Sequence, residues 1–309
     1  MAATACGASS GSSTSPPPSE HTVTPLPAIP IGAITVVTSP DQLERPIYAY
    51  LAKPSDVKTI QDAANVVTAQ CMQSFGLTSI PTQLDGFDDT AVEDLRSHTN
   101  LYGFFDPAVA SSKGYDMFRA PTTRTQPAPA SGVKISADGI GVQFGKDASG
   151  KTVQSYEGKP VPPGGCKAKG VEASGGTLPG LTPEDLPDGG PTIPYGDPRI
   201  IAVDAAWSHC MASKGYHFAN PFDAARAVTA NPPKSVSQIT HTPAEIDQAR
   251  ADIDCKLSTN LMGTDLAVQV AYDKRYIDSH AVALTQYRTQ LDDRVRKAAQ
   301  VIAASSSTQ

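Results

Sequence analysis

The sequence lacks a long apolar run, has few aromatic residues and carries no excess of positive charge. No stretch of about 18 or more apolar residues occurs in the 309-residue chain, so we expect no segment of it to span a membrane as a helix. Only 6% of the residues are aromatic, and the formal net charge is −6. Proteins that bind the phosphate backbone present a basic face, so this charge argues against nucleic acid as a partner.

The sequence also lacks the short motifs of common catalytic and cofactor sites. It contains no H-E-x-x-H pair, Walker loop, G-x-G-x-x-G turn or EF-hand loop. A G-x-S-x-G match at 7–11 has no strand before it and no helix after it, and an S-x-x-K match begins at Ser55, which is better explained as a helix cap. Acidic residues are scattered along the chain. We therefore predict a protein that is not an enzyme and uses no cofactor or metal.

Cysteine is scarce, and the first of the five cysteines lies in an unusual context. Cys6 follows Ala-Thr-Ala and precedes a glycine, which is typical of the lipobox of a bacterial lipoprotein signal. The charged and apolar parts of such a signal do not precede it, and we interpret Met1 as added for expression. The Ser/Gly/Thr/Pro tract that follows has too little apolar mass to fold. We predict that Cys6 is acylated and that 1–25 is a disordered tether; the alternative is a free cysteine in a flexible tail.

The other four cysteines predict two disulfide bonds. They are Cys71, Cys166, Cys210 and Cys255. An even number of cysteines in an exported protein typically forms disulfides, and four cysteines allow three pairings. A zinc site is the alternative, but structural zinc sites usually offer close ligand pairs and this chain has no C-x-x-C. A site that joins Cys210 to His209 and His217 is a further alternative, and we favour a disulfide there.

Two of these cysteines open the same six-residue pattern, C-M-x-S-x-G. It reads CMQSFG at 71–76 and CMASKG at 210–215. Each copy follows a run of apolar residues at helical spacing, and a glycine after such a run is a common stop signal. We predict that a helix ends in each copy with its cysteine on the buried side.

Aromatic residues gather in one region with few helix signals. Five of them fall within seventeen positions: Tyr102, Phe104, Phe105, Tyr115 and Phe118. One interpretation is a ligand-facing patch, and the other is core packing in a loop-rich region. Residues 133–146 then alternate apolar positions around an Asp-Gly dipeptide, which predicts a β-hairpin.

The last third of the sequence predicts a long helix. Thr242, Pro243 and Glu245 form a capping box, and apolar residues continue at helical spacing to about 302. We expect one helix over 243–303, or two that meet near Gly263. Four apolar residues recur every seven positions, as in a coiled coil: Ile277, Leu284, Leu291 and Ala298. This stripe either packs within the molecule or forms an arm that binds a protein partner.

Several segments resemble those of a family of secreted actinobacterial (Streptomyces-like) lipoproteins of uncharacterised function. The resemblance lies in YEGKPVPPGGC at 156–166, WSHCMASKGYHFANP at 207–221 and EIDQARADIDCKLSTNLMG at 245–263, together with the first-half segments CMQSFG and LYGFFDPAVASSKGYDMF. It covers about 45–290. The resemblance implies a cell-envelope location, a lipid anchor on Cys6 and disulfides among the other cysteines. We favour the pairs Cys71–Cys166 and Cys210–Cys255, which would staple each half of the chain separately.

The sequence as a whole predicts a mainly α fold with a small β element, two disulfide-stapled lobes and a long C-terminal helix. We place the N-terminal lobe at 26–180 and the C-terminal lobe at 181–309. We expect a non-enzymatic, lipid-anchored binding or scaffolding protein that lies at the outer face of the cell membrane or is secreted. In one version of this hypothesis it is accessory to an exporter. The alternatives are an enzyme that acts on cell wall or extracellular polymer and a capture protein for small molecules or peptides.

Overall fold

The structure is a computed structural model, and it describes residues 24–80, 104–115, 136–176, 182–229 and 240–306. Within these ranges the chain is mainly helical, with one two-stranded sheet. The helices are α1 (Pro54–Ser74), α3 (Pro107–Lys113), α4 (Ala137–Phe144), α5 (Gly165–Ala173), α6 (Pro198–Ser213), α7 (Pro221–Thr229), α8 (Pro243–Thr259), α9 (Leu261–Ser279) and α10 (Ala281–Ser306). The strands are β1 (Ser155–Tyr156) and β2 (Lys159–Pro160), and short 3-10 turns include η2 (Pro46–Tyr50). The predicted fold class is therefore confirmed.

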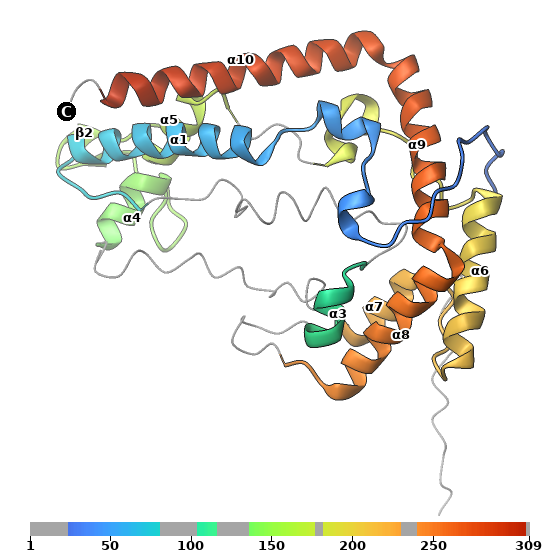
Figure 1. Cartoon of the computed structure of the whole chain (residues 1–309). Coiled ribbons are helices and arrows are strands. Elements are labelled where there is room, and N and C mark those ends of the chain that lie inside the picture. Colours follow the sequence, from blue (N-terminus) through green and yellow to red (C-terminus); the bar gives the residue numbers. More distant parts are fainter. Residues whose placement is uncertain (1–23, 81–103, 116–135, 177–181, 230–239, 307–309) are drawn as a thin grey trace, which may run out of the picture.

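The helices pack in two groups (Figure 1). In the first group α1 and α10 lie side by side, and α5 packs against α1. In the second group α8 packs against α3, α6, α7 and α9. Each group combines segments from both sides of position 180, because α10 joins α1 and α3 joins α8. The division into lobes 26–180 and 181–309 stays a prediction about folding units.

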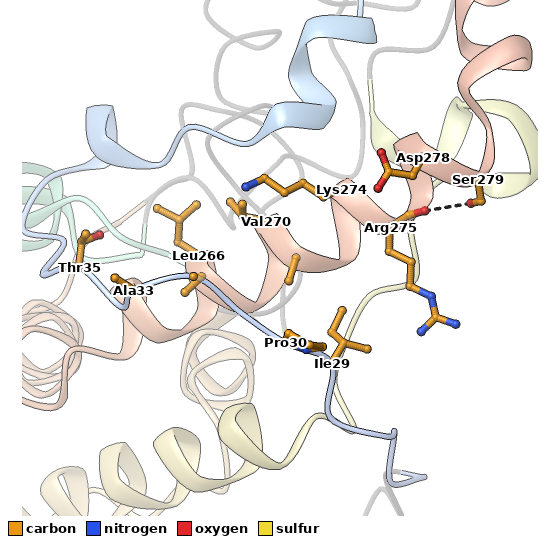
Figure 2. Close-up of a pocket in the computed structure, with 13 residues that line it drawn as sticks. Ile29, Pro30, Ala33, Thr35, Leu266, Val270, Lys274, Arg275, Asp278 and Ser279 are labelled. Atoms are coloured by element: carbon orange, nitrogen blue, oxygen red, sulfur yellow. Dashed lines mark hydrogen bonds between the residues drawn. The ribbon is translucent and has the colours of Figure 1, made fainter.

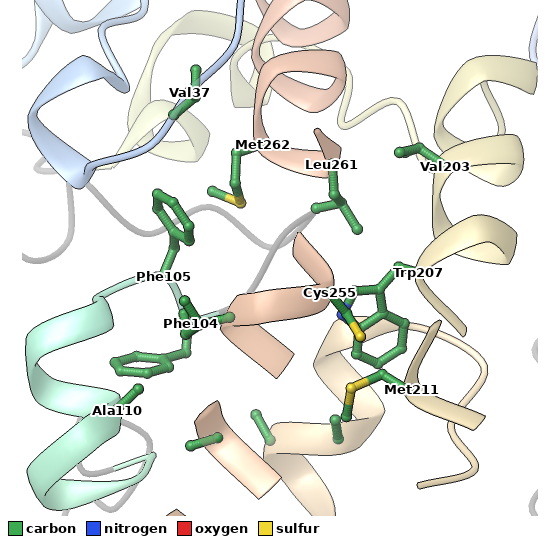
Figure 3. Packing of buried hydrophobic residues seen from close by; sticks show 14 of the residues in the cluster. Val37, Phe104, Phe105, Ala110, Val203, Trp207, Met211, Cys255, Leu261 and Met262 are labelled. Carbon is green, nitrogen blue, oxygen red and sulfur yellow. The ribbon is translucent and has the colours of Figure 1, made fainter. Parts of the chain in front are cut away.

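The larger core lies in the second group, around the single tryptophan (Figure 3). Trp207 and Met211 on α6 meet Cys255 on α8, while Phe104 and Phe105 enter from the other side of α8. These side chains are almost fully removed from water. Aromatic side chains bury the largest area per residue, so a chain with few of them concentrates its hydrophobic stabilisation where they gather.

Both predicted disulfides are present. Cys71 on α1 is bonded to Cys166 on α5, and Cys210 on α6 is bonded to Cys255 on α8. The α1–α5 contact is close at Gly170, where a β-carbon would overlap the carbonyl oxygen of Ala64. Each disulfide therefore links two helices of the same packing group.

The two C-M-x-S-x-G segments are both helix ends with the same geometry. Ser74 and Ser213 donate from Oγ to the carbonyl oxygen of the cysteine three residues before, at 2.6 and 2.7 Å. The glycines of the pattern, Gly76 and Gly215, adopt positive φ angles of 73° and 89°. The next residue in each copy returns a backbone hydrogen bond to the methionine carbonyl, which satisfies groups that a helix end would leave unpaired. The prediction of two helix exits is confirmed. Cys71 is buried as predicted, whereas Cys210 is only partly buried.

The hairpin predicted at 133–146 is wrong in the part that the structure describes. Residues 137–144 form helix α4, because the Ser136 side chain accepts a hydrogen bond from Gly139 N and caps a helix where a hairpin turn was expected. Gly145 ends α4 in the left-handed conformation. The small sheet lies further on, where Glu157 and Gly158 at φ 47° and 80° make a two-residue turn between β1 and β2.

The continuous helix predicted over 243–303 is divided into α8, α9 and α10. The first division is at Asn260, which adopts the left-handed conformation at φ 49°, and the second is at His280. The alternative of two helices that meet near Gly263 is confirmed for this first division, although Gly263 itself lies inside α9; the second division was not predicted. The start of α8 is as predicted in one respect, since the Thr242 side chain accepts from Glu245 N at 3.2 Å. The Glu245 carboxylate, however, accepts from Tyr115 N and does not complete a capping box.

The apolar stripe with seven-residue spacing packs inside the molecule. Leu284, Leu291 and Ala298 are the buried residues of α10, with exposed fractions of 0 to 2%. Leu291 and Ala298 pack with the apolar face of α1, and Leu284 packs with η2 and α9. This stripe is therefore not available to a partner protein, and a partner at another face of the helix stays a prediction.

Candidate functional site

A pocket with polar and aromatic lining residues lies between α6 and α7. Its volume is about 870 Å³. We call it the α6–α7 pocket. Three segments besides these helices contribute walls: the start of the described chain at 24–26, the loop 192–196 and the turn at 219–220. The residues used in the argument below are Tyr195, Ile201, Asp204, Ala205, Phe222 and Arg226.

Asp204 reaches the pocket from the edge of the α6 face that packs against the core. The helix starts at Asp197, which accepts from Arg199 N, and Pro198 occupies the first turn, where its missing N–H has no cost. Val203 and Trp207 on the buried face fix the rotation of the helix against α8 and α9. Asp204 follows Val203 and lies at the edge between core and pocket.

The Asp204 carboxylate is partly buried, and neither hydrogen bonds nor a paired cation fully offset the cost of removing its charge from water. Its Oδ1 is removed from solvent and has no hydrogen-bond partner among the described residues. Burial raises the pKa of Asp204 to about 7, and the positive charge of Lys256 opposes this only in part. A carboxylate that is half protonated near neutral pH can bind a cation in its charged form or exchange a proton.

The α7 wall carries a set of polar groups that already satisfy one another. Asn220 Nδ2 donates to Asp223 Oδ2 at 2.8 Å, and Asp223 N donates to Asn220 Oδ1 at 2.9 Å, so these two residues cap the start of α7. Asp223 also faces Arg226 at 3.9 Å. The Arg226 guanidinium lies 4.9 Å from the centre of the Phe222 ring. A cation over an aromatic face is attracted by the ring quadrupole.

The mouth of the pocket is apolar. Tyr195 and Ile201, which both line the pocket, are 44% and 45% exposed. The rim is closed by the N-terminal segment, since Leu26 N donates to Gly196 O at 2.8 Å. Position 196 requires glycine because a β-carbon there would overlap the carbonyl oxygen of Thr24.

A buried polar network lies behind Asp204, in the core of the second helix group. The Lys256 ammonium is fully buried and pairs with Asp252 at 2.9 Å. It also donates to the Phe104 carbonyl oxygen at 2.5 Å, and Trp207 Nε1 donates to Asp252 Oδ1 at 3.0 Å. Buried charges are tolerated when they are paired and hydrogen-bonded in this way.

Asp265 is the member of this network without partners. Both of its carboxylate oxygens are buried and accept no hydrogen bond from the described residues. Burial raises the pKa of Asp265 well above its ordinary value, and the neighbouring charge of Asp204 raises it further. Burial also raises the pKa of Asp252 and lowers that of Lys256, while their mutual attraction opposes both shifts. The pKa values of Asp265 and Asp204 are thus both raised, and that of Asp204 is raised to about 7.

A second hollow runs along α9, under the N-terminal segment (Figure 2). We call it the α9 groove; its volume is about 810 Å³. Leu266 and Val270 on α9 face the segment that carries Ile29, and the exposed Lys274 and Arg275 lie towards one end. The groove is mainly apolar, and none of the described residues that line it carries a buried polar side-chain atom without a hydrogen-bond partner.

The aromatic residues predicted as a ligand patch lie elsewhere. Phe104, Phe105 and Tyr115 are core residues with exposed fractions of 1%, 1% and 0%. Phe104 and Tyr115 pack edge to face, with ring centres 5.7 Å apart. This is the core-packing alternative, and these three side chains do not face a surface ligand. Tyr102, Phe118 and Cys6 lie outside the described residues.

Sequence reasoning missed Asp204 and Asp265. The signal that could have found them is an acidic residue inside an otherwise apolar helical stretch, IIAVDAAW for the first and LMGTDLAV for the second. An ionised side chain is rarely buried unless it is paired, so such a position marks either a structural ion pair or a functional group.

Comparison with protein-family models, with characterised proteins and with solved structures finds no match to this chain. In the described ranges no three His, Cys, Asp or Glu side chains are grouped so that they could hold a metal ion. None of the described helices combines the length and the apolar character that crossing a bilayer requires. The two disulfides are consistent with a location outside the cytoplasm.

Proposed function

We propose that the protein is a non-enzymatic binding protein of the cell envelope, located outside the cytoplasm, and that its ligand occupies the α6–α7 pocket. The observation that carries this proposal is the pocket itself: about 870 Å³, with an apolar mouth and the partly buried Asp204 carboxylate in its wall. Ligand sites are typically concave and mainly apolar, with a few polar groups that fix orientation. The disulfides support the compartment, and the resemblance to secreted lipoproteins supports the envelope.

The pocket is tested by blocking it. Ala205 is exposed on α6 and lines the pocket, whereas Ala202 is exposed on the same helix and does not line it. Thermal unfolding of the full chain is measured with a broad library of metabolites and peptides. Ligands that raise the melting temperature of the wild type and of Ala202→Trp, but not of Ala205→Trp, support the proposal. If no compound distinguishes the two variants, the pocket is not a ligand site.

The membrane attachment is tested separately in the native organism. Acylation of Cys6 predicts that the mature protein starts at this cysteine, carries lipid by mass spectrometry and sediments with membranes. A Cys6→Ser variant is expected to be released. If the protein is neither acylated nor retained in membranes, the lipid-anchor hypothesis is wrong. That result would not contradict the proposed binding pocket.

One observation favours an enzyme as the second candidate. Asp204 titrates near pH 7 and interacts electrostatically with the carboxyl group of Asp265, and paired carboxyl groups with different pKa values serve as general acids and bases. Turnover of peptidoglycan or another extracellular polymer that is lost in Asp204→Asn would favour the enzyme over the binding protein.

A further inference from the structure

We propose that the α6–α7 pocket takes a ligand with a protonated amine next to an apolar group, and that Asp204 holds the amine. This inference rests on the proposed binding function and adds the chemistry of the ligand. It comes from three features of the pocket: an acceptor without a partner, neighbouring charges that are already paired, and an aromatic mouth.

The interior of the protein does not neutralise Asp204. Lys256 is the buried cation that acts on it, but the Lys256 ammonium is engaged by Asp252 and by the Phe104 carbonyl oxygen. Asp265 faces Asp204 from α9 and is itself an acid, so it contributes repulsion when both are ionised. A positive group that complements Asp204 therefore has to come from the pocket side.

The remaining charged groups of the pocket are paired with one another. Asp223 accepts from Asn220 and faces Arg226, and Arg226 also lies over Phe222. His209 is exposed on α6. Among the described lining residues, Asp204 is thus the carboxylate with an oxygen that accepts no hydrogen bond. A charged ammonium donor binds a carboxylate more strongly than a neutral donor does.

The apolar part of the ligand is indicated by the mouth. Tyr195 and Ile201 leave about half of their surface in water, and Phe222 on α7 also lines the pocket. An apolar group against these side chains would remove that surface from water. Phe222 and Arg226 are neighbours four residues apart on α7, and the Arg226 guanidinium lies over the Phe222 ring.

Cation binding to Asp204 is coupled to a proton. Burial raises the pKa of Asp204 to about 7, so below that pH the carboxyl group must release its proton when the cation binds. Affinity for the cation is therefore expected to rise about tenfold between pH 6 and pH 8. Asp265 and Lys256 interact electrostatically with Asp204 from the core, and the other titratable or charged residues that line the pocket are His209, Asp223 and Arg226. A His209→Gln variant, measured in parallel, isolates the Asp204 contribution.

The experiment uses three probes that share a phenylethyl group and differ in charge: cationic 2-phenylethylammonium, neutral 2-phenylethanol and anionic 3-phenylpropanoate. Dissociation constants are measured with the full chain by amide chemical shifts at pH 6 and pH 8. The expected result is that the ammonium probe binds at least about tenfold tighter than the alcohol at pH 8. Ala205→Trp is expected to abolish its binding, Ala202→Trp to leave it unchanged, and Asp204→Asn to remove both the preference and the pH dependence.

The outcomes separate this inference from the proposed function. If the alcohol or the carboxylate binds as tightly as the ammonium probe, and Ala205→Trp blocks that binding, the pocket is a ligand site and the cationic preference is wrong. If the ammonium probe does not bind, or binds equally well to Asp204→Asn, the inference is overturned. The binding function itself fails only if the library screen also finds nothing that Ala205→Trp blocks.

Discussion

Gly263 on α9 lies directly against the backbone carbonyl of Thr35, so closely that a β-carbon at position 263 would overlap that oxygen. The neighbouring Asn260 holds the same segment from its left-handed position: its side-chain amide donates to Thr35 O at 3.1 Å and accepts from Val37 N at 3.4 Å. The bend between α8 and α9 and the attachment of the N-terminal segment are therefore the same structural feature.

The first prediction concerns this contact. Gly263→Ala is expected to destabilise the protein by about 1 to 3 kcal/mol, because the added methyl group must displace the segment around Thr35. Urea unfolding measures the loss, and hydrogen exchange of the 29–37 amides shows where it arises. Gly32→Ala is the matched control, since a β-carbon there meets nothing within 4 Å. Equal stability of the two variants would contradict the close contact.

The second prediction concerns the pH dependence that Asp204 imposes on stability. Its folded-state pKa of about 7 lies above the ordinary value of 3.8, so the folded state binds a proton that the unfolded state releases. Protonation of Asp204 contributes its whole stabilisation below about pH 4. As the pH rises to about 7, this contribution is lost, and the free energy of unfolding falls by about 2 to 4 kcal/mol. Asp204→Asn is expected to unfold at a higher temperature than the wild type at pH 8 and at a similar temperature at pH 4. The same melting temperature for both proteins at pH 8 would show that Asp204 is not desolvated.

The third prediction concerns the buried ion pair. Lys256→Met is expected to cost about 3 to 5 kcal/mol, because it leaves the Asp252 carboxylate buried without its partner. The double variant Asp252→Asn/Lys256→Met is expected to recover much of that loss. Lys214→Met removes one side of the exposed pair with Asp254, at 3.2 Å, and is expected to change stability by less than about 1 kcal/mol. A loss no larger for Lys256→Met than for Lys214→Met would contradict the buried position.

The fourth prediction concerns the disulfides. They close loops with sequence separations of 95 and 45 residues. In the chain-entropy model, replacing either pair by serines is expected to cost about 4 to 5 kcal/mol, slightly more for Cys71/Cys166. Denaturant unfolding of the two double variants measures both losses, and the wild type under reducing conditions should lose at least as much. If reduction does not change the free energy of unfolding, these two disulfides do not stabilise the protein as predicted.

The local features of this chain were largely predictable. Interactions within a few residues determine the helix exits at Gly76 and Gly215, the cap at Thr242 and the helical class. Such local interactions can be predicted from the amino-acid sequence. The hairpin prediction at 133–146 failed for a related reason. An Asp-Gly pair serves both turns and first helical turns, and the side chain of Ser136 decided between them.

The sequence by itself determined the mainly helical class, the two helix ends marked by cysteine and the presence of cysteines that could be paired. Only the tertiary structure decided that α10 packs on α1, that the aromatic residues 104, 105 and 115 form core, and that Asp204 meets a pocket while Asp265 is sealed behind it. These outcomes depend on contacts between residues far apart in the chain. Burial and the electrostatic field at a carboxyl group are properties of such contacts and of no single segment.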